Sequence, residues 1–202
     1  AGMGLVAGVD AVGGEGFEAG GHKGADELTT LVLVPQVADA VSIPVIAAGG
    51  IADGRAVAAA LALGAEGVQV GTRFAASEES SAHPAFKQAI VEMPDTGTYL
   101  MMKKVTPVRL IRNEFARRVQ ELEAAGATRD QLQELLGTGR ARRGMFDGDL
   151  VEGELEIGQI AGAIREILPA AQILRNIVAE YEAVRGHLPA LDPIGVSGIK
   201  ST

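Results

Sequence analysis

The stretch Ile43-Pro44-Val45-Ile46-Ala47-Ala48-Gly49-Gly50-Ile51 decides the fold class, because it is a short apolar run that ends in two glycines. Continuous runs of Val, Ile and Ala suit strands that are covered on both faces of a parallel sheet. The segment Gly67-Val68-Gln69-Val70-Gly71-Thr72-Arg73-Phe74 has the same form, and a strand near Val9 leads into another glycine-rich loop. We therefore expect three parallel strands, each ending in a phosphate-sized loop.

The segments between these strands are predicted to be helices. One short helix is expected from Val34 to Val41, and another from Asp53 to Leu63, with Gly64 as its stop. This alternation is typical of a βαβαβ run with right-handed crossovers. No G-x-G-x-x-G opens a helix here, so the pattern favours a (β/α) barrel over a dinucleotide-binding sheet.

The loop Glu15-Gly16-Phe17-Glu18-Ala19-Gly20-Gly21-His22-Lys23-Gly24 holds one histidine between glycines. Gly20 and Gly21 let the main chain approach a bound group closely, and histidine is the side chain that changes charge near neutral pH. The alternative is a strand-to-helix turn that carries a surface histidine. The two glycine motifs downstream favour a histidine held beside a flat ligand.

Two glycine pairs stand where a barrel would bind a phosphate. In (β/α) barrels the site lies at the carboxyl ends of the strands, and the loops after the last two often hold a phosphate. The backbone N–H groups of Gly49-Gly50 and Gly71-Thr72, with the Thr72 hydroxyl, could form such a cradle. Either pair alone could merely allow a tight turn, but two in consecutive units favour the cradle.

These motifs resemble those of the nitronate monooxygenase family, formerly called 2-nitropropane dioxygenases, which includes the flavin-dependent enoyl-acyl-carrier-protein reductases. Residues 15–24 resemble the family's catalytic-histidine loop, 47–54 its flavin-phosphate loop and 69–74 its second phosphate loop. The element Gly158-Gln159-Ile160-Ala161-Gly162 resembles its late return to the barrel. The resemblance covers about residues 8–185 and implies an α/β fold, a (β/α)8 TIM barrel, with FMN as cofactor.

The resemblance also implies roles for particular residues. It places His22 near the reacting carbon as the catalytic residue. It implies that the flavin is held by Glu15, Gly20, Gly21, Gly49, Gly50, Gln69, Val70, Gly71 and Thr72. In a nitronate monooxygenase the histidine would act as general base or orient the nitronate. In an enoyl reductase driven by NAD(P)H it would stabilise or protonate the enolate. Nitronate oxidation is preferred as the broader assignment, and enoyl reduction is the alternative.

The chain is expected to divide into a partial FMN-binding barrel (1–93), a helical region that caps the substrate pocket (94–157), a return to the barrel with a C-terminal helix (158–185) and a loosely ordered tail (186–202). Within these regions, helices are expected over the ranges Asn113–Ala125, Arg129–Leu136 and Ala170–Val184.

The length of the chain conflicts with a whole barrel. An eight-stranded barrel alone takes about 250 residues, whereas this chain has 202. We therefore expect the C-terminal portion of a barrel that lacks several N-terminal strands. Ala1-Gly2-Met3-Gly4 resembles the turn that ends the family's first strand, which would place the missing segment between Ala7 and Gly8. Alternatively, residues 1–7 are the end of a helix.

Composition excludes several classes of protein. Hydrophobic residues make up 47% of the chain, enough for a core, and the absence of cysteine excludes disulfides and cysteine-ligated metal. No apolar run approaches the about 20 residues of a membrane span, so we expect a cytoplasmic enzyme. A net charge of −8 argues against nucleic acid. No metal site is expected, and His83 is interpreted as a surface residue at a helix start.

Partners are expected to be a small nitronate or enoyl thioester and, in a homodimer, a second copy of the chain. The basic groups Lys103-Lys104, Arg117-Arg118 and Arg140 to Arg143 would suit an acidic acyl-carrier protein or the phosphates of NAD(P)H. Alternatively they belong to an ordinary solvated helix face with pairs such as Glu114 to Arg118. A hypothesis from another class is a non-catalytic, flavin- or phosphate-binding barrel remnant, because lost strands would expose sheet edges.

Overall fold

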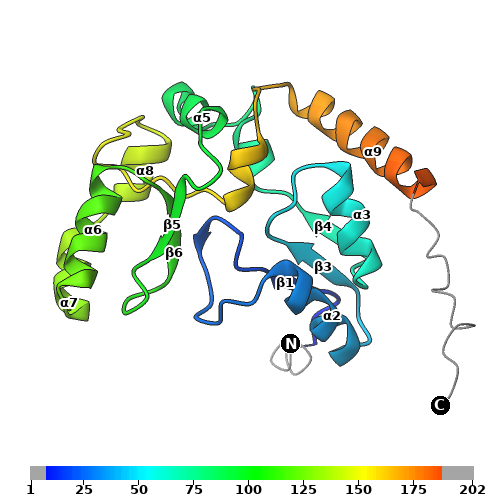
Figure 1. Cartoon of the computed structure of the whole chain (residues 1–202), viewed down its shortest axis with the longest axis horizontal. Coiled ribbons are helices and arrows are strands. Elements are labelled where there is room, and N and C mark those ends of the chain that lie inside the picture. Colours follow the sequence, from blue (N-terminus) through cyan, green and yellow to red (C-terminus); the bar gives the residue numbers. More distant parts are fainter. Residues whose placement is uncertain (1–7, 188–202) are drawn as a thin grey trace, which may run out of the picture.

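The computed structural model describes residues 8–187, which form two connected parts (Figure 1). One part is built on a three-stranded parallel sheet, and the other on a three-stranded antiparallel sheet. The expectations for residues 1–7 and 188–202 lie outside the described residues. No helix within the described part is long and apolar enough to cross a membrane.

The parallel sheet contains β1 (Val12–Glu15), β3 (Val45–Ala48) and β4 (Gly67–Gln69), in the order β1-β3-β4. The register pairs Val12 with Val45 and Ile46 with Gly67. The helices α2 (Thr30–Ala40) and α3 (Gly54–Ala62) connect the strands. The predicted βαβαβ run is therefore confirmed, with a first strand that begins at Val12 rather than near Val9.

The limits of α3 follow from local signals in the sequence. The Asp53 carboxylate caps the helix by accepting a hydrogen bond from the Ala56 N–H at 2.9 Å, a contact that is commonly worth about 1 kcal/mol. At the other end, Gly64 has a φ of +98°, a conformation that favours glycine. The predicted helix from Asp53 to Leu63 is confirmed to within its two capping residues.

The start of α2 differs from the prediction. The helix begins at Thr30 instead of Val34, so Pro35 lies inside it. The Thr30 N–H donates to both carboxylate oxygens of Glu18, at 3.1 and 3.0 Å. This distant carboxylate anchors the first turn before the proline, which is why local helix signals placed the start too late.

The antiparallel sheet corrects the expectation that residues 94–157 are helical. It contains β2 (Gly21–His22), β6 (Val108–Ile111) and β5 (Thr98–Met101), in the order β2-β6-β5. The helices α6 (Glu114–Ala124), α7 (Arg129–Leu136) and α8 (Arg140–Met145) follow the hairpin. The hairpin is stable here because its apolar side chains share a core with α6 and α7. This core comprises Met101, Met102, Val108, Leu110, Phe115, Ala116, Val119, Ala127 and Leu132.

The chain then returns to the part of the molecule that is built on the parallel sheet. The helices α4 (Thr72–Ala75) and α5 (Pro84–Val91) follow β4, and a 3₁₀ helix (Gln159–Ala163) precedes α9 (Ala170–His187). Where a return to the barrel was expected, the chain has this 3₁₀ helix and one parallel bridge between Ser77 and Leu168. α9 packs on α3, where Glu180 accepts a hydrogen bond from the Gly54 N–H at 2.9 Å.

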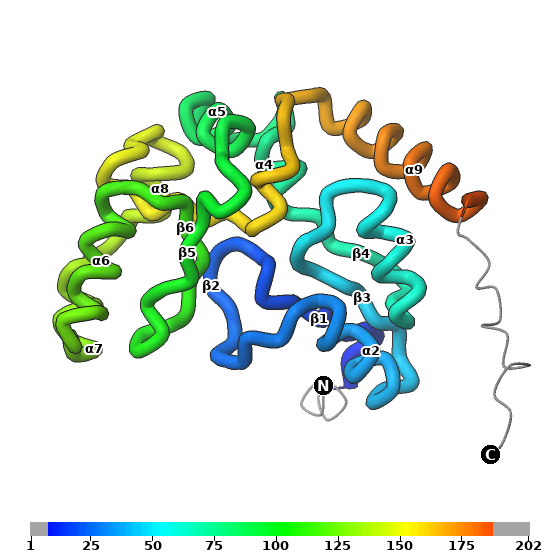
Figure 2. Tube along the Cα trace, viewed as in Figure 1, coloured from blue at the N-terminus to red at the C-terminus, as the bar shows by residue number. Residues whose placement is uncertain are grey.

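The segment from Leu155 to Gln159 joins the two parts of the molecule (Figure 2). On one side, the Ile111 N–H of β6 donates to the Leu155 carbonyl at 2.9 Å. On the other, the Gln159 N–H donates to the carbonyl of Glu18 at 2.9 Å. These hydrogen bonds tie the histidine-containing loop and β6 to the same segment. Residues from both parts of the molecule are therefore brought close together.

Candidate functional site

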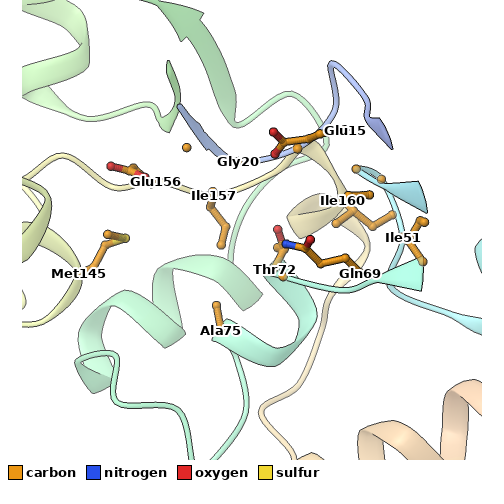
Figure 3. Close-up of a pocket in the computed structure, with 16 residues that line it drawn as sticks. Glu15, Gly20, Ile51, Gln69, Thr72, Ala75, Met145, Glu156, Ile157 and Ile160 are labelled. Carbon is orange, nitrogen blue, oxygen red and sulfur yellow. The ribbon is translucent and has the colours of Figure 1, made fainter. Parts of the chain in front are cut away.

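A cavity of about 300 Å³ lies at the carboxyl ends of β1, β3 and β4 (Figure 3). Its volume is at the lower end of the range for small-molecule and cofactor sites. Eight of the residues expected at the site line it: Glu15, Gly20, Gly21, Gly49, Gly50, Gln69, Gly71 and Thr72. Val70 and His22 do not line it. The glycine motifs are thus brought together around one space.

The loop after β3 has a backbone conformation with positive φ angles, which glycine adopts most readily. Gly49 and Gly50 have φ angles of +99° and +70°. A Cβ on Gly49 would come within 3.0 Å of the Gly16 carbonyl oxygen. The Thr30 hydroxyl donates to the Gly49 carbonyl at 2.9 Å. The loop therefore exposes backbone, rather than side chains, to the cavity.

The loop after β4 meets the cavity differently. A Cβ on Gly71 would have no atom within 4 Å, and its φ of −96° is open to any residue. The Thr72 hydroxyl accepts a hydrogen bond from the Gly158 N–H at 3.1 Å. That bond fixes the oxygen while its own hydrogen remains able to donate to a ligand. Gly71 thus leaves free space, and Thr72 supplies an oriented donor beside it.

Gly20 has a structural role that the sequence did not reveal. A Cβ there would overlap the carbonyl carbon of Ile157 and lie 2.5 Å from the Gly158 nitrogen. The close approach that Gly20 permits is therefore to the chain itself. It lets the histidine-containing loop and the segment after Leu155 form one wall of the cavity.

His22 lies behind this wall, at the surface. Its side chain is 49% exposed, and its Nδ1 is 3.6 Å from the Glu156 Oε1. Glu156 lines the cavity, and its side chain is 21% exposed. Burial raises the pKa of the Glu156 carboxyl above its usual range, and the nearby His22 opposes that rise. The cavity-facing member of this pair is therefore Glu156.

The other cavity residues missed by sequence reasoning are mainly apolar. Figure 3 shows Met145, Ile157 and Ile160 around the space, with Ala75 at its floor. Met145 ends α8, so the region after residue 94 contributes directly to the cavity. One indication of these apolar residues was present in the sequence: Ile157 and Ile160 flank the pair Gly158-Gln159, which belongs to a recognised motif. Contact between the two parts of the molecule is what brings them to the cavity.

Two basic side chains, Arg109 of β6 and Lys23 of the loop itself, donate hydrogen bonds to the backbone of the histidine-containing loop (residues 15–24). The Arg109 guanidinium is buried, donates to the Phe17 carbonyl at 3.0 Å through Nη2, and lies 4.5 Å from the centre of the Phe17 ring. The Lys23 ammonium donates to the carbonyls of Phe17 and Ala19. Burial, then the charge of Arg109, lowers the pKa of Lys23 to about 8. Both side chains act on the backbone of the loop and hold its shape.

The basic groups expected at a docking rim are mostly paired with acids. Lys103 pairs with Glu27, Arg118 with Glu152 and Arg143 with Asp149. The expected pairing of Glu114 to Arg118 is wrong, because Glu114 pairs with Arg117, three residues along α6.

His83 lies at a helix start, as expected. It caps α5 through Nδ1, which accepts a hydrogen bond from the Ala85 N–H at 3.1 Å. Within residues 8–187, no group of three or more His, Asp or Glu side chains could hold a metal ion.

Glu154 makes stability depend on pH. It is 4% exposed, and its Oε1 is buried without a hydrogen-bond partner. Burial, then the charge of Glu156, raises the pKa of Glu154 above its usual 4.5. Folded Glu154 therefore keeps a proton that the unfolded chain releases, so this carboxyl lowers the free energy of unfolding as pH rises above about 4.5.

We expect Glu154→Gln to melt higher than the parent protein at neutral pH, and to lose this advantage near pH 4.5. A gain of 1 kcal/mol would raise Tm by about 2–4 °C at this chain length. Calorimetric Tm across that pH range is the measurement, with the exposed Glu134→Gln as control. A difference in Tm that is the same at both pH values would contradict the expectation.

Comparison with known proteins agrees with this geometry. A model of the nitronate monooxygenase family matches residues 2–180. A probable nitronate monooxygenase of Staphylococcus saprophyticus is 46% identical over 128 residues, which are 58% of this chain and 36% of that protein. The chain thus spans about a third of the length of this curated relative.

Two solved structures resemble most of the chain. FabK from Thermotoga maritima matches with a TM-score of 0.84 and 49% identity, over 92% of this chain and 60% of its own. A nitroalkane oxidase from Streptomyces ansochromogenes matches with a TM-score of 0.74 and 34% identity, over 90% of this chain and 54% of its own. These likenesses confirm the α/β class that the sequence predicted.

Proposed function

Because the chain belongs to the nitronate monooxygenase family, we propose that it forms the flavin site of an FMN-dependent oxidoreductase that oxidises alkyl nitronates with dioxygen. The observation that carries the proposal is the cavity at the strand ends, lined by two glycine loops and bordered by the His22–Glu156 pair. The parallel sheet would be part of a (β/α)8 barrel, and residues 94–157 would cap the substrate pocket.

The residues around the cavity fit FMN. Backbone N–H groups of Gly49, Gly50 and Gly71, with the Thr72 hydroxyl, would hold the phosphate, since such groups bind anions well. The open space beside Gly71, which a Cβ would begin to fill, leaves room for that group. Glu15 and Gln69 offer polar atoms to the edge of a flat ring system. When bound, FMN supplies a group that accepts and returns two electrons.

The protein's own contribution would be positioning and proton handling. The apolar side chains of Met145, Ile157 and Ile160 exclude water from one side of the cavity. His22, outside the cavity and beside Glu156, would help to orient an anionic nitronate or act as general base, as the sequence analysis proposed. General acid–base help of this kind is commonly worth about 10²- to 10⁴-fold in rate.

The alternative is an NAD(P)H-dependent enoyl-acyl-carrier-protein reductase. The higher identity to FabK, 49% against 34% for the nitroalkane oxidase, favours it. Charge gives little support for an acyl-carrier protein as partner, because Lys103, Arg118 and Arg143 are paired with acids. A non-catalytic remnant remains a third hypothesis, since Ile46 in the central parallel strand is 37% exposed.

Anaerobic reduction of the flavin tests these alternatives. The purified protein would be mixed in separate cuvettes with an alkyl nitronate, NADH or NADPH, and the yellow absorbance followed. We expect bleaching by the nitronate alone. Bleaching by a nicotinamide alone would establish the reductase instead. Protein that carries no flavin, and gains none when FMN is added, would reject both and leave the remnant.

A further inference from the structure

We propose that Glu156 is a second acid–base residue of this site, and that its carboxyl exchanges protons between the cavity and the imidazole of His22. The proposal deepens, and rests on, the proposed function. Its structural basis is that Glu156 lines the cavity whereas His22 does not. A proton that leaves or enters a substrate in the cavity would therefore meet the carboxyl before the imidazole.

The two side chains are held together by the backbone of β6. His22 pairs with Val108 of β6, and Glu156 forms an antiparallel bridge with Leu110, two residues further along. β5 occupies the other edge of β6. Gly21 and Glu156 are therefore neighbours along one edge, and a Cβ on Gly21 would lie 2.7 Å from the Glu156 Oε2. A side chain at position 21 would displace the carboxyl, so the glycine is needed for this contact.

The distance and exposure of the pair suit proton exchange. Glu156 Oε1 and His22 Nδ1 are 3.6 Å apart, and a small side-chain rotation would bring them within hydrogen-bonding distance. A carboxylate that takes a proton from the cavity passes it to Nδ1 of the neutral imidazole. The imidazolium, whose side chain is 49% exposed, then releases a proton to water. The reverse sequence supplies a proton to the cavity.

The charged groups around Glu156 support this role. Glu154, two residues before it, is buried, while Arg140 of α8 acts on Glu154. The Arg109 guanidinium of β6 is directed at the Phe17 carbonyl. A proton on His22 favours the Glu156 carboxylate, and burial of the carboxyl moves the Glu156 pKa upward against that influence. A carboxyl whose pKa is raised in this way holds its proton to higher pH, which suits it to donate as well as accept a proton.

The coupling can be measured without flavin. A carboxyl ¹³C NMR titration of Glu156 would be recorded in the flavin-free parent protein, His22→Ala and His22→Asn. We expect both variants to raise the Glu156 pKa, because they remove the positive charge that favours its carboxylate. His187→Ala, at the exposed end of α9, is the matched control and should leave the titration unchanged. A Glu156 titration that does not move in either His22 variant would overturn the proposal.

Turnover provides the second measurement. We expect Glu156→Gln to lower kcat by about 10²-fold, at the lower end of the range for acid–base groups, with little change in KM or FMN content. The limb of the pH profile that belongs to Glu156 should disappear. Adding His22→Ala to Glu156→Gln should cost little more, because both act on one proton path. Glu134→Gln, on the exposed face of α7, should match the parent.

The two experiments separate the proposals. If the parent protein bleaches with neither nitronate nor nicotinamide, the proposed function fails, while the NMR titration still decides whether the pair is coupled. If turnover is normal and Glu156→Gln keeps both the kcat and the pH profile of the parent, the role of Glu156 is refuted and the proposed function stands.

Discussion

In the His22→Ala variant, turnover is expected to fall by about 10²- to 10⁴-fold, the usual contribution of a general acid or base, while FMN stays bound. The side chain does not line the cavity, so its removal leaves the surface proposed to bind flavin intact. It is also half exposed, and truncation opens no hole in a packed core. The loss should therefore appear in kcat rather than in flavin content or folding.

The measurement is steady-state turnover with the substrate that bleaches the flavin, alongside flavin absorbance and Tm. His187→Ala serves as the control for loss of an exposed histidine. Turnover in His22→Ala within a factor of about two of the parent, far below the 10²-fold expected of an acid–base group, would remove His22 from the mechanism. Glu156 would then be left as the acid–base group at the cavity.

Much of the site was predictable because its signals are local. A glycine pair at the end of an apolar run predicts a strand-end loop whatever lies around it. The positive φ angles of Gly49 and Gly50 show that the glycines are required there. The helix from Gly54 to Ala62 was equally predictable, since Asp53 caps its start and Gly64, with its positive φ, follows its C-terminal cap. Such features need no knowledge of distant contacts.

The hairpin of β5 and β6 was missed because tertiary contacts hold it. The four residues of β6 include Arg109, and a charged residue interrupts the apolar run that would predict a buried strand. In the fold Arg109 is nevertheless only 2% exposed. Arg109 is tolerated there because the Phe17 carbonyl and the Thr98 hydroxyl accept its hydrogen bonds. Thr98-Tyr99-Leu100-Met101, a β-branched and aromatic run before a lysine pair, was the signal that could have found the hairpin.

Glu156 illustrates a different limit. The sequence analysis placed it at the end of the region 94–157, expected to be helical and to cap the pocket, and nothing local connects it to His22. The connection exists because both lie along the edge of β6, which the sequence analysis did not recognise as a strand. Missing one strand therefore concealed the charged partner of the histidine. Val70 was expected at the cavity for a different reason, as part of the loop after β4. It packs instead against the core around Val34 and Ala47, while its neighbours Gln69 and Gly71 line the cavity.

The prediction that best separates binding from folding is Gly71→Leu, which we expect to fold normally and lose FMN. Position 71 has a φ open to leucine, and a Cβ there meets nothing within 4 Å, so the backbone is not strained. Because Gly71 lines the cavity, we expect the added side chain to occupy part of that space. Gly50→Leu should also lose FMN, but its φ of +70° would strain the loop as well.

We expect the Kd for FMN to rise at least about 100-fold in Gly71→Leu, equivalent to about 2.8 kcal/mol, with Tm of the flavin-free protein unchanged. Titration of that protein with FMN, followed by flavin fluorescence, measures the Kd, and a thermal melt of the same flavin-free sample measures Tm. Gly186→Leu is the matched control, since a Cβ there also meets no atom within 4 Å but lies on α9, away from the cavity. If Gly71→Leu binds FMN as tightly as the parent, the open space beside Gly71 is not the phosphate site. The cradle would then have to be built from Gly49, Gly50 and Thr72 alone.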